Sequence, residues 1–129
     1  MSSEKFFSGA PWEKTVGYCR AIKTGDIIEI AGTTATNEEG KTVGINNVTV
    51  QTEYIINKAE KALAALGATL QHVTRTRIYV TNIADWKKIG KVHGHFFGSI
   101  TPVTTMVEVS KLIDPELLIE MEFTANLNA

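Results

Sequence analysis

Residues 101–125 (TPVTTMVEVSKLIDPELLIEMEFTA) constrain the fold most, because a short Asp114-Pro115 turn joins two segments of strong apolar and polar alternation. Alternation with a period of two is typical of strands whose two faces meet different surroundings. If the two segments pair with each other, one face gathers Thr105, Val107, Val109, Ile119, Met121 and Phe123, and the other gathers Thr104, Met106, Glu108, Glu120 and Glu122. We expect the first face in the core, whereas the second face needs a partner or a function.

Length and composition indicate a single globular unit. The chain has 129 residues, of which 43% are hydrophobic. A domain of about this length buries roughly two-thirds of its unfolded surface. We therefore predict one domain over residues 1–129.

The charge pattern limits the kinds of partner that we expect. Thirteen basic and fourteen acidic residues give a net charge of −1 without a basic run, so no nucleic-acid partner is expected. No apolar stretch approaches the roughly 20 residues that a membrane-spanning helix needs. Cys19 is the only cysteine and the first residues lack a secretory pattern, so we expect a reducing, cytoplasmic location.

The rest of the chain alternates between strand and helix patterns. Residues 16–22 and 27–31 predict a hairpin, because the loop between them ends in a Gly-Asp pair. Apolar residues at helical spacing predict a helix over residues 49–66, with Asn46 or Asn47 as its cap. A strand over residues 73–81 and a second helix between Asn82 and Gly98 follow, and we expect close backbone approach at Gly90 and Gly94.

This order predicts an α+β fold, with both helices on one face of a mixed sheet. The other face has no helix to cover it. Met106, the carboxylates, Arg75 and Arg77 are its candidate residues. Such a face can be solvated or packed against another subunit, and its partly apolar character favours a subunit interface.

Short motifs recur along the chain in a specific order. They are Gly17-Tyr18 before the hairpin, Gly32, Arg77-Ile78-Tyr79-Val80-Thr81-Asn82, Phe96-Phe97, Pro102, Val107-Glu108-Val109 and Ile119-Glu120-Met121-Glu122. In this order and spacing the chain resembles the Rid/YjgF family of enamine and imine deaminases, whose older label is L-PSP endoribonuclease. The resemblance implies a chorismate-mutase-like fold, a homotrimer with ligand clefts between subunits, and no cofactor.

The resemblance also implies site residues. Glu120 matches the acidic residue that orients the hydrolytic water, although an ion pair with Arg75, Arg77 or a neighbouring chain is an equally good reading. Tyr18 matches an aromatic wall of the cleft, with core packing as its alternative. Gly32 and Thr33 match a segment of backbone donors, although a β-bulge also favours glycine.

One family position differs in this chain. Deaminating members carry an arginine two residues after the proline, where its two parallel donors bind a substrate carboxylate. Here Thr104 stands in that position, followed by Thr105 and Met106, and Thr104 and Met106 are predicted to line the substrate site. Losing a charge-assisted hydrogen bond predicts at least about tenfold weaker binding of a carboxylate, unless Arg20, Arg75 or Arg77 replaces it.

Three functions remain open at this point. An enzyme would hydrolyse a reactive enamine or imine to a carbonyl compound and ammonia, with Glu120 placing the water. A binding module would hold the same small metabolite without turnover. Endoribonuclease activity is disfavoured because the chain offers no basic groove.

No metal site is predicted, since His93 and His95 point in different directions on a helix.

Overall fold

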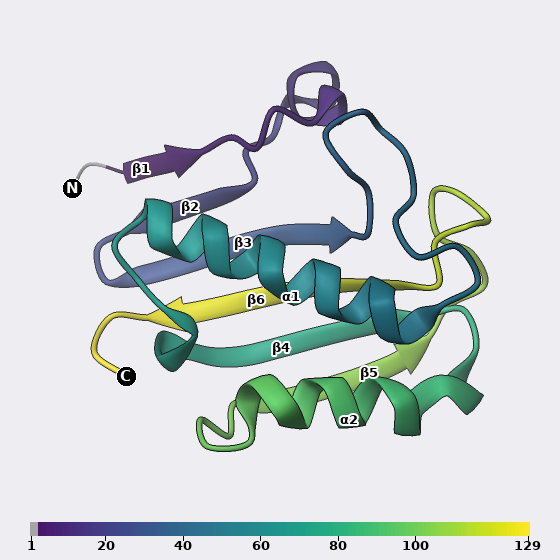
Figure 1. The fold of residues 1–129 in the computed structure, drawn as a ribbon. Helices are drawn as coiled ribbons and strands as arrows, with labels where there is room; N and C mark the ends of the chain where they lie inside the picture. The colour runs from purple at the N-terminus through teal and green to yellow at the C-terminus, as the bar shows by residue number, and fades with distance from the viewer. Residues whose placement is uncertain (1–2) are drawn as a thin grey trace.

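A computed structural model describes residues 3–129 and places six strands in one sheet (Figure 1). The elements are β1 (Ser3–Phe6), the π-helical turn η1 (Glu13–Gly17), β2 (Ala21–Thr24), β3 (Ile27–Thr34), α1 (Val48–Ala65), the 3-10 turn η2 (Leu70–His72), β4 (Val73–Val80), the 3-10 turn η3 (Ile83–Asp85), α2 (Trp86–Phe97), β5 (Val103–Glu108) and β6 (Ile119–Asn126). The strand order is β1-β2-β3-β6-β4-β5. Only the β4–β5 pair is parallel, so the sheet is mixed, as predicted.

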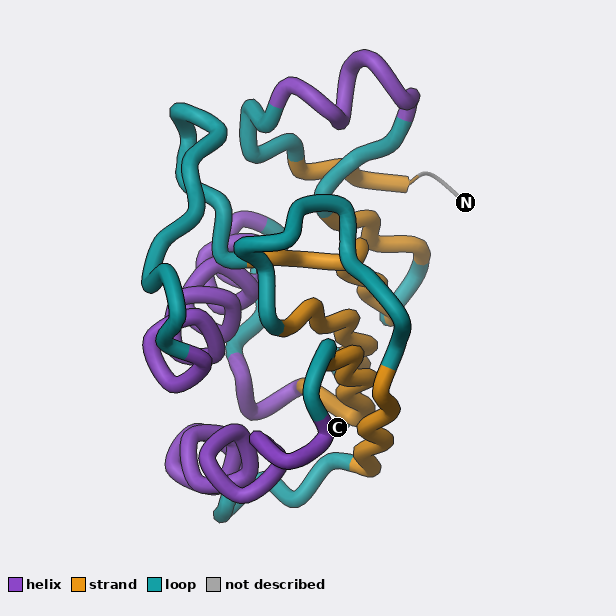
Figure 2. Tube along the Cα trace, turned by 90° about the vertical axis from the view of Figure 1, so that its right-hand side faces the viewer, coloured by secondary structure: helices purple, strands orange, loops and turns teal. Residues whose placement is uncertain are grey.

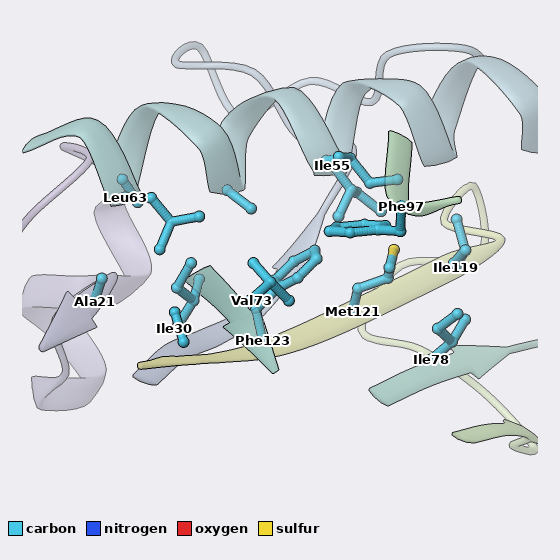
Figure 3. Packing of buried hydrophobic residues seen from close by; sticks show 14 of the residues in the cluster. Ala21, Ile30, Ile55, Leu63, Val73, Ile78, Phe97, Ile119, Met121 and Phe123 are labelled. Carbon is cyan, nitrogen blue, oxygen red and sulfur yellow. The ribbon is translucent and has the colours of Figure 1, made fainter. Parts of the chain in front are cut away.

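Both long helices lie on the same face of the sheet (Figure 2). The Asn47 side chain accepts a hydrogen bond from the Val50 amide and caps α1, as its position predicts. The buried stripes of the helices pack on β3, β4 and β6, and Figure 3 shows Ile55, Phe97 and Met121 meeting in this core. The predicted α+β fold with helices on one face is therefore confirmed. No helix in residues 3–129 combines the length and apolarity that crossing a membrane requires.

The predicted pairing of the two C-terminal strands is wrong. β4 lies between β5 and β6, with Ile78 opposite Met106 on one side and Met121 on the other. β5 runs parallel to β4, and a parallel neighbour is reached by a crossover, which α2 provides. β5 is consequently an edge strand, and the segment around Asp114 is a long connection that passes β4.

This topology reverses the predicted faces of β5. Cross-strand partners share a face, so Thr104, Met106 and Glu108 lie on the helix-covered face with Met121, and not with the carboxylate of Glu120. Thr105 and Val107 lie instead on the helix-free face with Glu120, Glu122, Arg75 and Arg77, while Val109 follows the end of the strand. The predicted burial of Ile119, Met121 and Phe123 is confirmed.

Two local predictions also need correction. Residues 16–22 do not form one strand, because η1 ends at Gly17, whose φ of 92° favours glycine, and β2 begins only at Ala21. The chain also forms an N-terminal strand, β1, which pairs with β2. Gly90 and Gly94 have open space where a Cβ would lie, so within the chain they make no close backbone approach.

Candidate functional site

A cavity of about 280 Å³ opens at the end of the sheet where β3 ends and β6 begins. The β3 and β6 strands, α1 and the loops around η1 and after β3 contribute to its walls. Its lining residues are Ala10, Pro11, Trp12, Val16, Tyr18, Arg20, Gly32, Thr34, Thr36, Asn37, Gly40, Lys58, Ile113 and Glu120. Apolar walls with a few converging polar groups are typical of small-molecule sites.

Glu120 contributes the carboxylate of this cavity. It is half-buried, and its carboxylate makes no hydrogen bond or ion pair with residues 3–129. Burial raises the pKa of Glu120, the nearby Glu122 adds to this rise, and the Arg20 guanidinium opposes it. A carboxylate of this kind accepts a proton at a pH closer to neutrality than an ordinary glutamate does.

Gly32 fixes the place of this carboxylate. The register of β3 against β6 shifts between Ile30 and Thr33, which indicates a β-bulge in the segment that contains Ala31 and Gly32. A Cβ at Gly32 would collide with Oε2 of Glu120 and lie 3.2 Å from its Cδ. The missing side chain therefore lets the carboxylate lie directly against the β3 backbone.

Arg20 forms the rigid cationic wall of the cavity. Its Nε donates to Oε2 of Glu13 at 3.2 Å, and its Nη1 donates to the Gly32 carbonyl at 2.6 Å and to Oγ1 of Thr33 at 3.2 Å. Its Nη2 donates to the Tyr18 hydroxyl at 3.3 Å. These bonds hold a buried guanidinium in one orientation, which reduces the entropy lost when it binds a ligand.

Lys58 on α1 brings a second cation to the cavity. Its Nζ donates to the Thr36 carbonyl at 3.1 Å. Burial lowers the pKa of Lys58, and the positive charge of Arg20 lowers it further, against smaller opposite effects of Glu13 and Glu38. Sequence reasoning missed this residue, although Ile55 and Ala62, three residues before it and four after it, belong to the buried stripe of α1.

The structure brings together some of the predicted site residues and separates others. Tyr18, Gly32 and Glu120 line one cavity, and Thr33 lies next to it beneath Arg20. Thr104 and Met106 lie on β5, outside this cavity of the same chain. The Thr104 hydroxyl instead shares a hydrogen bond of 2.8 Å with the Thr76 hydroxyl, which is 2.9 Å from Nε2 of His93.

The structure also separates the alternative readings. Within residues 3–129 neither Arg75 nor Arg77 forms an ion pair with Glu120, and neither lines the cavity. Glu122 accepts a hydrogen bond from the Tyr79 hydroxyl at 2.7 Å. Of the three arginines considered as replacements for the missing one, only Arg20 reaches the cavity.

Comparison with known proteins identifies the family. The family model described as Endoribonuclease L-PSP matches residues 9–127. The chain belongs to this family, also known as Rid/YjgF. A Rid/YjgF protein from Mycobacterium tuberculosis, described as a member of the YjgF/YER057c/UK114 family, has a crystal structure with 43% identity and a TM-score of 0.88, covering 97% of this chain and 99% of that one.

Curated Rid/YjgF relatives extend this comparison. An uncharacterised protein of Streptomyces coelicolor is 35% identical, over 92% of this chain and 87% of its own length. The 3-aminoacrylate deaminase RutC of Acinetobacter baylyi is 26% identical, over 85% of this chain and 86% of its own length. Family membership thus rests on nearly the whole chain, and one relative carries the name of a deaminase.

Proposed function

We propose that this Rid/YjgF protein binds a small metabolite in the cavity and hydrolyses it as a reactive enamine or imine, giving a carbonyl compound and ammonia. The observation that carries the proposal is the Glu120 carboxylate, which faces the cavity without a protein partner and has a raised pKa. Partly buried carboxylates are normally hydrogen-bonded, and one that is kept free is suited to bind water or ligand. The deaminase name of the relative from Acinetobacter baylyi supports the same class of reaction.

The reaction needs one proton acceptor and no cofactor. The species that reacts is the iminium ion, formed when solvent protonates an imine on nitrogen or an enamine on carbon. Glu120 accepts a proton from water as the water oxygen attacks the iminium carbon, which gives a neutral carbinolamine. The protonated carboxyl then donates that proton to the nitrogen, the C–N bond breaks as ammonia leaves, and the hydroxyl proton passes to solvent to give the carbonyl compound. Tyr18 closes one wall, and the backbone at Gly32 keeps the carboxylate beside the reacting carbon.

We also propose that the protein is a homotrimer in which the ligand cleft lies between subunits. The helix-free face supports this, because Val103 and Val107 on the edge strand β5 are 56% and 42% exposed. Exposed apolar residues on an edge strand favour association with another chain. In such an assembly Thr104 and Met106 would border the cavity of a neighbouring chain and complete its ligand site.

An ammonia-release assay tests the function, with carboxylated imines generated by an amino-acid oxidase and uncharged imines generated by an amine oxidase. Carboxylated and uncharged imines are supplied to the wild type, to Glu120→Gln and to the matched control Glu29→Gln, a carboxylate on the same sheet face. We expect the wild type and Glu29→Gln to release ammonia alike, and Glu120→Gln to lose at least about a hundredfold in rate. Saturable ligand binding without turnover by the wild type would instead establish the non-catalytic binding module.

A further inference from the structure

The ammonium of Lys58 lies in the wall of the cavity without a carboxylate partner. Residues 3–129 contain two ion pairs, Arg20 with Glu13 and Lys23 with Glu4, and neither involves Lys58. Its one hydrogen bond to a protein group goes to the Thr36 carbonyl, so two of its three N–H donors remain for another group. A lysine that only covered apolar surface would extend its ammonium into water, whereas Nζ of Lys58 bonds to the Thr36 carbonyl and lies 6.0 Å from the centroid of the Tyr54 ring.

Lys58 also stands between two cavities. A second cavity of about 160 Å³ adjoins the first, and the two share the residues Ala10, Arg20, Thr36, Asn37 and Lys58. The second cavity adds Lys61 and one acidic residue, Glu38. Cations therefore gather where the two cavities meet.

The charges around the junction favour an anion there. The charge of Arg20 is balanced by Glu13, which is itself held by the amide and hydroxyl of Ser8. Lys58 forms no ion pair within residues 3–129, and the charges of Glu13 and Glu38 offset the burial of its ammonium only in part. Removing an ammonium from water without a counterion is unfavourable, and burial together with Arg20 lowers the pKa of Lys58 accordingly. A ligand anion would restore that balance.

We propose that Lys58, supported by Arg20, is the anion-recognition residue of this site, binding an acidic group of the ligand, a carboxylate or a phosphate, at the junction of the two cavities. This proposal rests on the proposed function, which places the reacting carbon beside Glu120. Repulsion from Glu120 and attraction to Lys58 then orient the ligand, with its acidic group at the junction and its C=N carbon toward Glu120. The substrates that fit are imines or enamines carrying such an acidic group.

Binding of small probes, measured by isothermal titration calorimetry, tests the proposal without turnover. The probes are pyruvate, methyl phosphate and pyruvamide, the uncharged amide of pyruvate. Lys58→Met removes the charge and keeps the length of the side chain, Lys58→Arg keeps the charge, and Lys88→Met on α2 is the matched control. Arg20 is left intact, because its removal would leave the buried Glu13 unpaired.

We expect at least one of the two anions to bind the wild type. The affinity of Lys58→Met for that anion should be lower by a factor of about ten or more, which is the loss expected for one charge-assisted hydrogen bond. Lys58→Arg and Lys88→Met should retain binding, and retention by Lys58→Arg shows that no Schiff base is needed. If Lys58→Met loses affinity for pyruvate alone, the site binds a carboxylate. If it loses affinity for methyl phosphate alone, the site binds a phosphate. Pyruvamide binding should be equal in the wild type and Lys58→Met.

The proposal is overturned if Lys58→Met binds both anions as the wild type does, if pyruvamide binds as tightly as the tighter of the two anions, or if neither anion binds the wild type. These outcomes are separate from those of the ammonia assay. Lys58-dependent anion binding without ammonia release leaves the anion site in place and removes the proposed hydrolysis. Ammonia release that is unaffected in Lys58→Met, for acidic and uncharged imines alike, leaves the hydrolysis in place and removes the anion site.

Discussion

Replacing Gly32 by alanine should inactivate the site without unfolding the protein. The φ of Gly32 is not positive, so the β3 backbone accepts an alanine without strain. The added Cβ collides with the end of the Glu120 side chain, and the three heavy atoms nearest to it all belong to that side chain. The carboxylate can therefore move aside by rotating its side chain, which costs about 0.5–1.5 kcal/mol.

This cost is partly offset by the lower entropy of the unfolded chain, since a tolerated Gly→Ala change stabilises a protein by about 0.4–1 kcal/mol. The free energy of unfolding of Gly32→Ala should thus stay within about 1 kcal/mol of the wild-type value. The carboxylate, however, has to withdraw by roughly 1 Å, and a displacement of that size can lower a rate by about a hundredfold.

Urea unfolding and ammonia release, measured on the same preparations, separate the two effects. Gly90→Ala serves as the control, because a Cβ at Gly90 meets open space. Wild-type activity in Gly32→Ala would refute the idea that contact with β3 positions Glu120. A loss of stability above about 1 kcal/mol would show that the surroundings of Gly32 cannot adjust, since overpacking of a rigid site costs about 1–3 kcal/mol.

Four further predictions follow from the same geometry. Gly90 and Gly94 lie in the interior of α2 with open space around them, so replacing either by alanine should raise the free energy of unfolding by about 0.5–1 kcal/mol. Unchanged or lower stability in urea titrations would show that a neighbouring chain approaches there. Glu120→Gln should be more stable than the wild type at pH 7. A carboxyl whose pKa is raised in the folded state stabilises the fold fully below its unfolded pKa of about 4.3, and this contribution is lost as the pH rises through the folded-state pKa. Thermal unfolding should show this advantage fading toward pH 4, and an advantage that persists there would contradict the burial origin of the shift. Thr104→Arg should lose the hydrogen bond to Thr76, at about 1 kcal/mol, yet tighten pyruvate binding about tenfold if β5 borders a neighbouring cavity; unchanged binding would count against that assembly. Light scattering at micromolar concentration should give three times the chain mass of 14.1 kDa, and a monomer would rule out the intersubunit cleft.

The elements with strong local signals were predictable from the sequence. The α1 helix combines a regular apolar stripe with the Asn47 cap, and β4 is rich in β-branched residues, so their local preferences agree with the final fold. The place of β5 was not predictable in this way. Alternation assigns side chains to two faces of a strand, but the neighbouring strand decides which face is buried, and β4 was the neighbour that the local pattern did not reveal.

The site was predictable only where the resemblance supplied positions. Tyr18, Gly32 and Glu120 line one cavity of the chain, and their roles in binding and catalysis stay predictions. The contribution of Lys58 depends on how α1 packs beside the loop after β3, which is a contact between distant segments. Arg20 was one of three candidate arginines, and only the pairing of β2 with β3 places it beside the Gly32 carbonyl.

The pH dependence of ammonia release tests the role of Glu120 most directly. After subtraction of the non-enzymatic rate, the wild-type rate should fall as the pH drops through the pKa of Glu120, at a value above the roughly 4.3 of an ordinary glutamate. Glu120→Gln should be slow at every pH and lack this transition. A Glu120→Gln variant with the wild-type rate and pH profile would contradict the account.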